Sequence, residues 1–246
     1  MEKSCKTIRN LIFAISDVDN DAAINMIFEK KDSIQVIVTP NIDHLMRFDK
    51  DESFRVLYSV ADIYFNDSVI IKYLSRFLWS RNIRNVNRGS DLTIQVMSKI
   101  PCDGKVLLIG GEAGDDFFIK RKYGINRVEQ IIPDYGFYRS SSSIDKLVDQ
   151  ICNSEPDYLF LCVGSPQQEL VASILKDRMS FPSKVLCVGA SLDFIAGRQV
   201  RAPRFISSIG MEWAFRMLSN PRRLFSRYFK NFVWLVSVTF KSRNGL

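Results

Sequence analysis

Short runs of consecutive apolar residues, rich in valine, isoleucine and leucine, recur along the chain and alternate with longer segments of helical periodicity. Strands that are apolar throughout, rather than at every second position, are expected where helices cover both faces of a parallel sheet. The pattern therefore predicts buried parallel strands. The runs that carry this prediction are residues 34–39 (IQVIVT), 61–65 (ADIYF), 105–110 (KVLLIG), 157–164 (DYLFLCVG) and 184–190 (KVLCVGA).

Helices are predicted between these strands. Residues 141–154 and 166–179 place apolar side chains at helical spacing, and their first turns hold serine, proline or glutamine. Repeated alternation of strand and helix is typical of α/β proteins. We therefore expect a Rossmann-like, mostly parallel sheet with helices on both faces.

Charge divides the chain near Ala196. The 246 residues carry a net charge of +7, but residues 198–246 alone hold ten lysines and arginines against one acid, Glu212, so that the rest of the chain carries −2. We expect an α/β core in residues 1–196 and a basic, aromatic helical appendage in residues 197–246. An anionic partner should bind to the appendage.

The appendage contains a predicted amphipathic helix. Pro221 suits a first helical position, with Asn220 as the cap. On a helix that begins there, four cations share an arc of roughly 140° and six apolar residues take the opposite side. The cations are Arg222, Arg223, Arg227 and Lys230, and the apolar residues are Leu224, Phe225, Tyr228, Phe229, Phe232 and Leu235. Such a helix is typical of a surface that lies on anionic lipid, with Phe225 and Phe229 inserted, although an ordinary helix packed on the core is the alternative.

Cysteine usage and hydropathy predict the cellular compartment of the protein. The five cysteines are scattered and never at C-x-x-C spacing, which argues against a disulfide framework or a zinc site and favours a reducing compartment. The apolar stretch at residues 11–16 is too short for a signal peptide. The uncharged run at residues 231–240 is about half of the ~20 residues that span a bilayer. We therefore expect a cytoplasmic protein without a transmembrane helix.

Polar residues and glycines follow the predicted strands, where open parallel sheets bind their ligands. Thr39 and Asn41 follow the first strand, Asp67 follows the second, and Gln168 and Glu169 follow the fourth. Glycines at such positions let the backbone approach a phosphate or sugar closely. The candidate nucleotide-binding glycines are Gly110, Gly111, Gly164 and Gly189.

Each of these features also has a structural interpretation. Asp67 is either a general base or a carboxylate that caps the next helix. Gln168 and Glu169 either contact a ligand or merely occupy the first turn of a helix. His44 is the only histidine, which excludes Ser-His-Asp triads and multi-histidine metal sites, and its default role is at the surface or in a cap. Acid–base chemistry therefore falls to carboxylates.

Several stretches, taken in order, are similar to one enzyme family. They are TPN at 39–41, Asp67, GSDL at 89–92, LLIGG at 107–111, GSPQQE at 164–169, DFIAG at 193–197, RAP at 201–203 and MEWAFRMLSNPRR at 211–223. In this combination they resemble the WecG/TagA/CpsF glycosyltransferase family (glycosyltransferase family 26), over residues 34–228. The resemblance implies a Rossmann-like core and a C-terminal appendage that meets the membrane.

The resemblance also implies an activity. Members of this family transfer a sugar, with inversion, from a UDP-sugar to a lipid-linked acceptor, usually a polyprenyl-diphosphate saccharide. The product would enter bacterial cell-surface polysaccharides, and the protein would be peripheral on the inner face of the cytoplasmic membrane. The implied residues are Asp67 as general base, Thr39, Asn41, Gln168 and Glu169 in substrate binding, and Arg201, Arg204 and Arg216 on the diphosphate.

The chain departs from the family at three positions. Ser68 follows the aspartate where glycine is usual, and Gln167 stands where lysine is common. Val86 replaces an arginine three residues before Gly89. Either Arg84 or Arg88 takes the role of that arginine, or the role is absent.

Two other classes of protein share part of the pattern. An NAD-type Rossmann oxidoreductase needs a fuller glycine fingerprint and an acid about 20 residues further on. A nucleic-acid-binding protein would be equally basic and aromatic but should carry a recognisable binding motif. We therefore expect a transferase without a cofactor or a nucleic-acid partner. Its metal dependence and its possible homo-oligomeric state stay open, with a metal-independent enzyme favoured.

Overall fold

The computed structural model describes residues 2–200, 202–203, 206, 211–219 and 221–243. Within these ranges the backbone alone is described for residues 2–6, 216, 219, 223 and 241–243.

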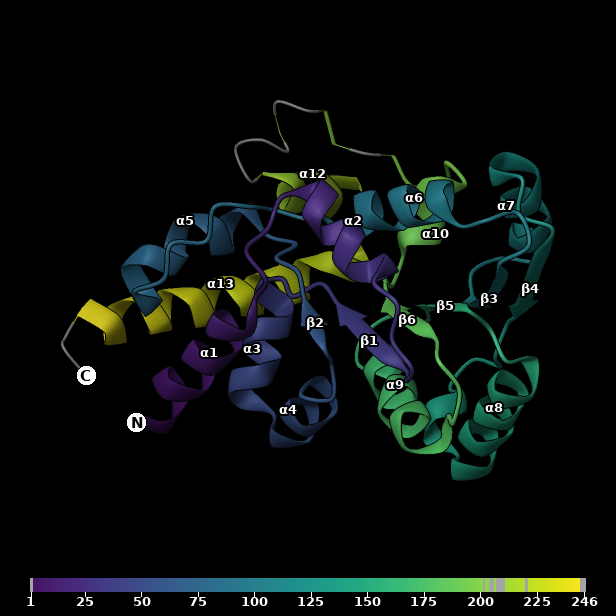
Figure 1. The fold of residues 1–246 in the computed structure, drawn as a ribbon. Coiled ribbons are helices and arrows are strands. Elements are labelled where there is room, and N and C mark those ends of the chain that lie inside the picture. Colours follow the sequence, from purple (N-terminus) through teal and green to yellow (C-terminus); the bar gives the residue numbers. More distant parts are fainter. Residues whose placement is uncertain (1, 201, 204–205, 207–210, 220, 244–246) are drawn as a thin grey trace.

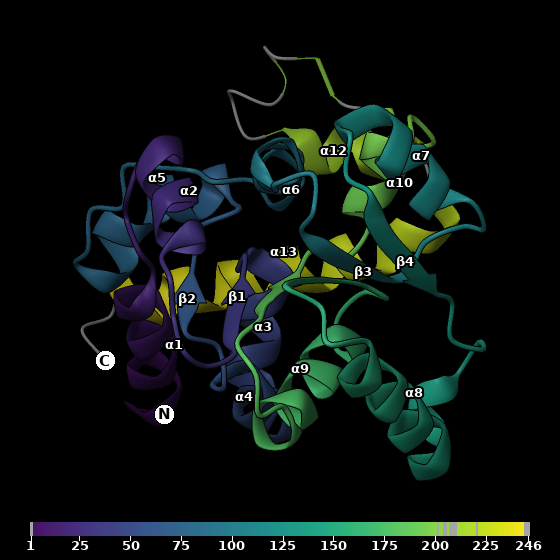
Figure 2. The ribbon, with the colours of Figure 1, turned by 45° about the vertical axis from the view of Figure 1, so that its right-hand side comes forward.

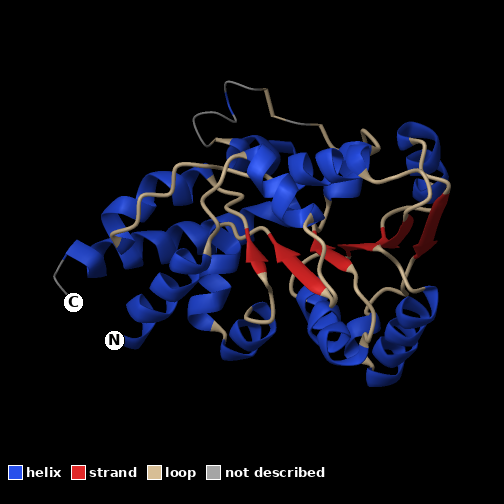
Figure 3. Ribbon diagram, viewed as in Figure 1, coloured by secondary structure: helices blue, strands red, loops and turns tan. Residues whose placement is uncertain are grey.

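A six-stranded parallel sheet lies at the centre of the described part of the chain (Figure 3). The strands follow the order β2-β1-β6-β5-β3-β4, and every pairing is parallel. The fold class is therefore confirmed, and each of the five predicted apolar runs contains a strand. The strands are β1 (Gln35–Val38), β2 (Ile63–Tyr64), β3 (Lys105–Gly110), β4 (Arg127–Ile131), β5 (Tyr158–Cys162) and β6 (Lys184–Cys187).

The sixth strand, β4, has no counterpart among the predicted runs. It pairs only with β3 at the edge of the sheet, and its Arg127 and Glu129 are exposed while Val128 is buried. An edge strand with one solvated face alternates polar and apolar residues. The criterion of a continuous apolar run therefore does not detect β4.

Helices cover both faces of the sheet and bury two separate cores (Figures 1 and 2). One face carries α1 (Glu2–Ala14), α3 (Ile42–Lys50), α4 (Glu52–Tyr58), α5 (Val69–Trp79), α8 (Ser141–Ser154), α9 (Gln167–Arg178) and α13 (Pro221–Arg243). The other carries α2 (Asn20–Phe28), α6 (Gly89–Lys99), α7 (Asp115–Tyr123) and α10 (Ser191–Ile195). The two predicted helices correspond to α8, with the bounds expected, and to α9.

Two further elements complete the described chain. A short 3-10 helix, η1 (Phe137–Arg139), leads into α8, and α12 (Glu212–Ser219) precedes the C-terminal helix. None of the helices in the described ranges is long and apolar enough to cross a membrane.

The C-terminal helix α13 begins at Pro221, as predicted, whereas its expected cap, Asn220, lies outside the described residues. The helix packs against α3 and α5. Its Trp234 is buried in the core, and the indole N–H donates to Asp49 Oδ2 at 2.8 Å. The tail is thus joined to the fold by apolar contact and by a hydrogen bond to a charged group; the boundary after residue 196 stays a prediction.

The prediction that six apolar residues of α13 share one side is only half right. Four side chains spaced seven, three and four residues apart face the core; these are Leu224, Asn231, Trp234 and Val238. Phe225, Phe229 and Phe232 are exposed instead. At about 100° per residue the two stripes point in directions roughly 150° apart. The apolar arc of the helix is therefore wide: its one edge packs on the core, and its other edge is exposed to solvent.

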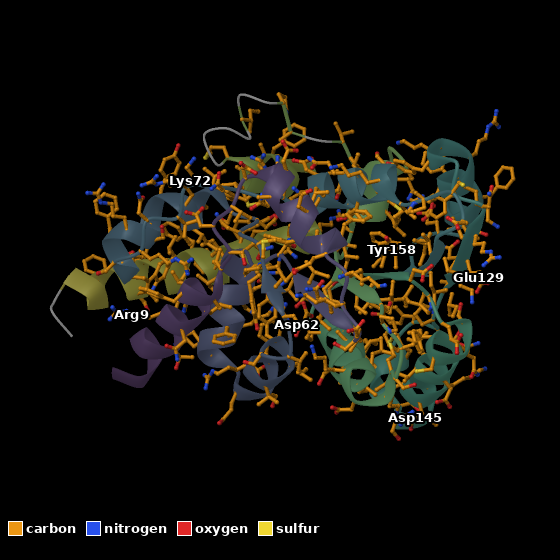
Figure 4. All side chains as sticks on the ribbon, in the orientation of Figure 1. Arg9, Asp62, Lys72, Glu129, Asp145 and Tyr158 are labelled. Atoms are coloured by element: carbon orange, nitrogen blue, oxygen red, sulfur yellow. The ribbon has the colours of Figure 1, made fainter. Side chains whose placement is uncertain are left out.

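Acidic residues at the amino edge of the sheet have structural roles. Asp62, labelled in Figure 4, accepts the N–H of Val36 and pairs with Lys176 of α9. Asp157 accepts the N–H of Lys105 in the same way, at 2.9 Å. These carboxylates satisfy the first backbone groups of neighbouring strands, and the candidate chemistry therefore lies at the opposite edge.

Candidate functional site

A cavity opens at the carboxyl edge of the sheet where the chain reverses its direction of travel. The chain leaves β3 towards β4 on one side and leaves β5 towards β6 on the other, although β3 and β5 are neighbours. Ligands of open α/β sheets bind in the crevice at such a switch point. The cavity has a volume of 240 Å³ and is lined by Gly111, Glu112, Cys162, Gly189, Ala190, Leu192 and Asp193.

Two of the four predicted glycines, Gly111 and Gly189, line this cavity. Gly111 has a φ of +79°, and a Cβ there would stand 2.5 Å from Asp115 Oδ2. Only glycine fits this turn, because both the backbone conformation and the space exclude a side chain. Gly110 and Gly164 lie in the adjacent turns with positive φ values but are not part of the lining.

The cavity wall is held by Arg198, at the start of the basic segment. Its guanidinium donates two hydrogen bonds to Asp115, at 2.7 and 2.8 Å, and two to Asp193, at 3.1 and 3.0 Å. Burial alone would raise the pKa of Asp115, but the bonds from Arg198 and from the Glu112 N–H lower it. Arg198 therefore joins the first residue of α7 to α10, and its guanidinium is engaged with carboxylates.

Asp67 lies at the same edge, two residues before the first residue of α5. Its Oδ1 accepts the N–H of Gly89 at 2.9 Å, and its own N–H donates to Pro40 O at 3.0 Å. Gly89 is the first residue of α6, so the carboxylate faces the positive end of a helix. A Cβ at Gly89 would lie 2.8 Å from Thr39 Oγ1. The structure thus brings Thr39, Asp67 and Gly89 together from three separate motifs.

The role of Ser68 explains why serine can replace the usual glycine after Asp67. Ser68 is the N-cap of α5, and its hydroxyl accepts the N–H of Ile71 at 3.3 Å. The alternative in which Asp67 itself caps this helix is therefore wrong. The carboxylate of Asp67 faces α6 and not α5.

Asn41 uses its side-chain oxygen in a cap. Its Oδ1 accepts the N–H groups of Asp43 and His44, and His44 Nδ1 accepts the N–H of Asn41 at 3.2 Å. This capping box confirms the capping role expected of the only histidine, although its ring packs against Phe54 and Tyr58, which also contact each other, and does not lie at the surface. Burial lowers the pKa of His44 to about 4, so that the ring is neutral at neutral pH.

Gln168 and Glu169 occupy the first turn of α9 and are almost fully buried. Gln168 Oε1 accepts the N–H of Gly189 at 2.8 Å, and Gln168 Nε2 donates to Glu169 Oε1 at 2.9 Å. Glu169 Oε1 lies 3.9 Å from His44 Nε2. The ligand contacts predicted for Gln168 and Glu169 stay predictions, but Gln168 clearly holds a turn that lines the cavity.

Arg84 and Arg88 are the two arginines near Val86. Arg88 adjoins the group formed by Asp67 and Gly89. It directly precedes Gly89, and its Nε lies 3.2 Å from Glu212 Oε2 in α12. Arg84 is exposed, and its backbone N–H donates to Asp17. The ion pair of Arg88 therefore connects the Asp67 loop with the C-terminal segment.

The other predicted arginines are described only in part. Arg201 and Arg204 lie outside the described residues, and so do the side chains of Arg216 and Arg223. Arg222, Arg227 and Lys230 are exposed on α13. Phe225 and Phe229 are exposed too, and their rings stack with centroids 6.1 Å apart.

Asp-x-Asp spacing, which metal sites use, occurs three times, at residues 17–19, 19–21 and 49–51. Four of the five carboxylates accept hydrogen bonds from the protein, whereas Asp21 is exposed in the first turn of α2. Asp17 accepts the backbone N–H groups of Arg84 and Asn85, while Asp19 caps α2. Asp51 caps α4, and Asp49 accepts from the indole of α13. No group of three potential metal ligands is found among the described residues.

The parallel sheet, the cavity at its switch point and the polar strand ends define a Rossmann-like α/β protein with its site at the carboxyl edge. The sequence model of the glycosyl transferase WecG/TagA/CpsF family matches residues 8–245, which is nearly the whole chain. The protein therefore belongs to this family and is a glycosyltransferase. The family is membrane-associated and serves the synthesis of cell-surface polysaccharides. It uses a sugar-nucleotide donor and a lipid-linked acceptor.

Proposed function

We propose that the protein transfers a sugar from a UDP-sugar to a hydroxyl of a polyprenyl-diphosphate-linked saccharide, with inversion, and that Asp67 is the general base. The observation that carries this proposal is the position of Asp67, at a strand end beside Thr39 and Gly89. A carboxylate there can accept a proton from an acceptor sugar that approaches the carboxyl edge of the sheet.

In this reaction the acceptor oxygen attacks the anomeric carbon of the donor as its proton passes to Asp67. The bond between that carbon and the diphosphate oxygen breaks, and UDP leaves with the bonding electron pair. Attack from the face opposite the leaving group inverts the configuration. The negative charge that develops on UDP needs cations, and Arg88 together with Arg201, Arg204 and Arg216 is proposed to supply them without a metal ion.

The donor is proposed to bind in the cavity at the switch point. Its glycine turns allow backbone N–H groups to approach a diphosphate closely. Asp193 on the opposite wall offers a carboxylate that can accept hydrogen bonds from ribose hydroxyls. Gln168 would act on the donor through the Gly189 turn that it holds.

The exposed side of α13 is proposed to lie on the inner face of the cytoplasmic membrane. Its apolar side chains follow one another at intervals of four, three, four and four residues; they are Phe225, Phe229, Phe232, Val236 and Phe240. We call these five residues the aromatic stripe. Arg222 and Lys230 are exposed beside it. Aromatic insertion next to cations suits an anionic lipid surface, where the polyprenyl chain of the acceptor is embedded.

The test of Asp67 is the Asp67→Asn variant. The amide has the size of the carboxylate and can still accept from Gly89, so we expect the fold and the UDP affinity to remain. Turnover should fall by at least ~100-fold, the scale on which a general base acts. Turnover is measured with a panel of UDP-sugars and a synthetic polyprenyl-diphosphate acceptor. Near wild-type turnover would remove Asp67 from the mechanism.

The matched control is Asp62→Asn, at the amino edge. Asp62 also accepts a backbone N–H but lies at the opposite end of the strand that leads to Asp67. Its replacement should alter stability and leave the turnover of the folded enzyme unchanged. Equal losses of turnover in the two variants would show that Asp67 acts on the fold alone.

A further inference from the structure

Glu169 is a buried carboxyl group that has no lysine or arginine counter-ion among the described residues. Its side chain is 2% exposed, and among the described residues its Oε2 has no hydrogen-bond partner. Its Oε1 accepts one bond, from the amide of Gln168. An ionised carboxylate that is buried in this way would cost several kcal/mol unless a cation were in contact with it.

The groups around Glu169 do not supply such a cation. His44 is nearest, but its Nδ1 accepts a backbone N–H, so that the ring is neutral and presents its Nε2–H to Glu169 from 3.9 Å. Arg47 is bonded to Asp43 at 2.9 Å and is thereby compensated. Among the described residues, the titratable and charged neighbours are Asp43, His44 and Arg47 of α3, Tyr58 of α4 and Cys187 of β6. Beyond them, Arg227 of α13 acts on His44 and Asp67 acts on Tyr58.

Tyr58 and Cys187 are uncharged as well. Burial raises the pKa of both the Tyr58 phenol and the Cys187 thiol. Burial likewise raises the pKa of Glu169. The bond from Gln168, together with smaller contributions from the Glu169 backbone N–H, the Ser165 hydroxyl and the charge of Arg47, opposes this only in part. The cluster between α3, α4, α9 and β6 is therefore neutral apart from the internally paired Asp43 and Arg47.

This cluster connects two strand-end loops of the site. Glu169 holds the Gln168 amide, and Gln168 in turn accepts the N–H of Gly189 in the cavity wall. On its other side Glu169 faces His44, which accepts the N–H of Asn41 in the loop after β1. The amide orientation of Gln168 is determined by both of its bonds, because only its oxygen can accept from Gly189 and only its nitrogen can donate to Glu169.

We propose that Glu169 is a positioning residue that works as a neutral acid: it fixes the amide of Gln168, and through it the Gly189 turn, without bringing a charge into the donor site. Glutamine has nearly the shape of a protonated glutamic acid and offers the same acceptor beside a donor. The proposal therefore separates Glu169→Gln from Glu169→Ala. The test has two arms. The binding arm rests on the proposed donor site, whereas the stability arm is independent of any function.

The binding arm measures UDP affinity by calorimetry with the full-length chain. Glu169→Ala leaves the Gln168 amide without its acceptor and frees the turn, so the Kd for UDP should rise about tenfold, as expected for one lost buried hydrogen bond. Glu169→Gln should stay within about threefold of the wild type. In the kinetic assay Glu169→Ala should raise the KM for the donor more than it lowers kcat. Equal damage by both substitutions would show that an ionised Glu169 is required and would overturn the proposal.

The stability arm compares thermal unfolding of the wild type and Glu169→Gln at several pH values. A carboxyl group whose pKa is raised in the folded state stabilises fully below its usual pKa, and this contribution is lost as the pH rises towards the folded value. The melting temperature of the wild type should therefore fall relative to that of Glu169→Gln as the pH rises above about 4.5. A difference that grows in favour of the wild type with rising pH would mean a native carboxylate and would overturn the proposal.

Glu52→Gln is the matched control. Glu52 also lies in the first turn of a helix, α4, but it is exposed. Replacing the exposed Glu52 should cost only a small charge–dipole interaction and should not show the pH dependence expected for Glu169→Gln. A Glu169→Gln chain that fails to fold while Glu52→Gln folds would also overturn the proposal, because a neutral acid tolerates the amide. If the wild type does not bind UDP, the donor assignment fails while the stability arm still decides the state of Glu169.

Discussion

The proposed lipid contact of α13 can be tested through Phe225 and Phe229. Their side chains are 59% and 58% exposed. Complete burial of a phenylalanine contributes about 1.5–3 kcal/mol, so transfer of the exposed part of either ring into lipid would contribute about 1–2 kcal/mol. One factor of ten in an equilibrium constant corresponds to about 1.4 kcal/mol. Each Phe→Ser substitution should therefore weaken binding to liposomes about tenfold, and the double variant about a hundredfold.

The assay is sedimentation with liposomes that contain anionic lipid, compared with neutral liposomes and with raised salt. The wild type should bind only the anionic liposomes, and salt should release it, because each cation near the surface contributes about 1 kcal/mol and is screened within a Debye length. Replacing Arg222 and Lys230 by glutamine should weaken binding as well. Val56→Ser, which removes an exposed apolar side chain from α4, serves as the control.

The melting temperature decides whether a loss of binding is specific. Phe225 and Phe229 are exposed on the helix, so their replacement should leave the melting temperature nearly unchanged. Wild-type liposome binding by the folded double variant would refute the reasoning about the aromatic stripe. If only the charge variants lost binding, attraction between charges would be the whole interaction and insertion would be excluded.

Three further outcomes are expected. Gln168→Ala should raise the donor KM without changing the pH profile, because an amide orients the Gly189 turn but does not titrate; unchanged kinetics would leave Gln168 with a packing role only. Trp234→Phe should lower the free energy of unfolding by about 1.5–3 kcal/mol in urea titrations, since it removes a buried hydrogen bond to the charged Asp49; an unchanged midpoint would contradict this. Dialysis against EDTA should leave turnover intact if arginines alone balance the charge on UDP, whereas a loss restored by Mg²⁺ would assign that role to a metal.

Much of the sheet could be predicted because parallel strands buried on both faces leave an unambiguous apolar run. The run at 105–110 coincides with β3, residue for residue. β4 was missed since an edge strand alternates, and Arg127 and Glu129 interrupt its apolar character. The rule that strand ends carry the chemistry identified Thr39 and Asp67, which the fold places against the same glycine, Gly89.

The buried connections of the site were not predictable in the same way. A glutamate in the first turn of a helix usually faces solvent, and nothing in the local sequence distinguishes the exposed Glu52 from the buried Glu169. The partnership of Glu169 with His44 depends on how α3 packs against α9, across more than a hundred residues of chain. The apolar residues of α13 are a similar case. Periodicity predicts the direction in which they point, but not which of them the core covers.

The way α13 is held has a consequence for how the enzyme would meet a bilayer. Its core-facing side chains, from Leu224 to Val238, extend along about 21 Å of helix, and Trp234 adds a hydrogen bond to α3 near the middle. A helix that packs on the core along such a length has a fixed orientation relative to the rest of the domain, unlike a flexible tether. If its aromatic stripe rests on lipid, the whole domain takes one tilt, and Asp67 is held at one fixed height above the headgroups. The depth at which an acceptor must present its hydroxyl would then be set by the packing of Trp234 as much as by the pocket itself.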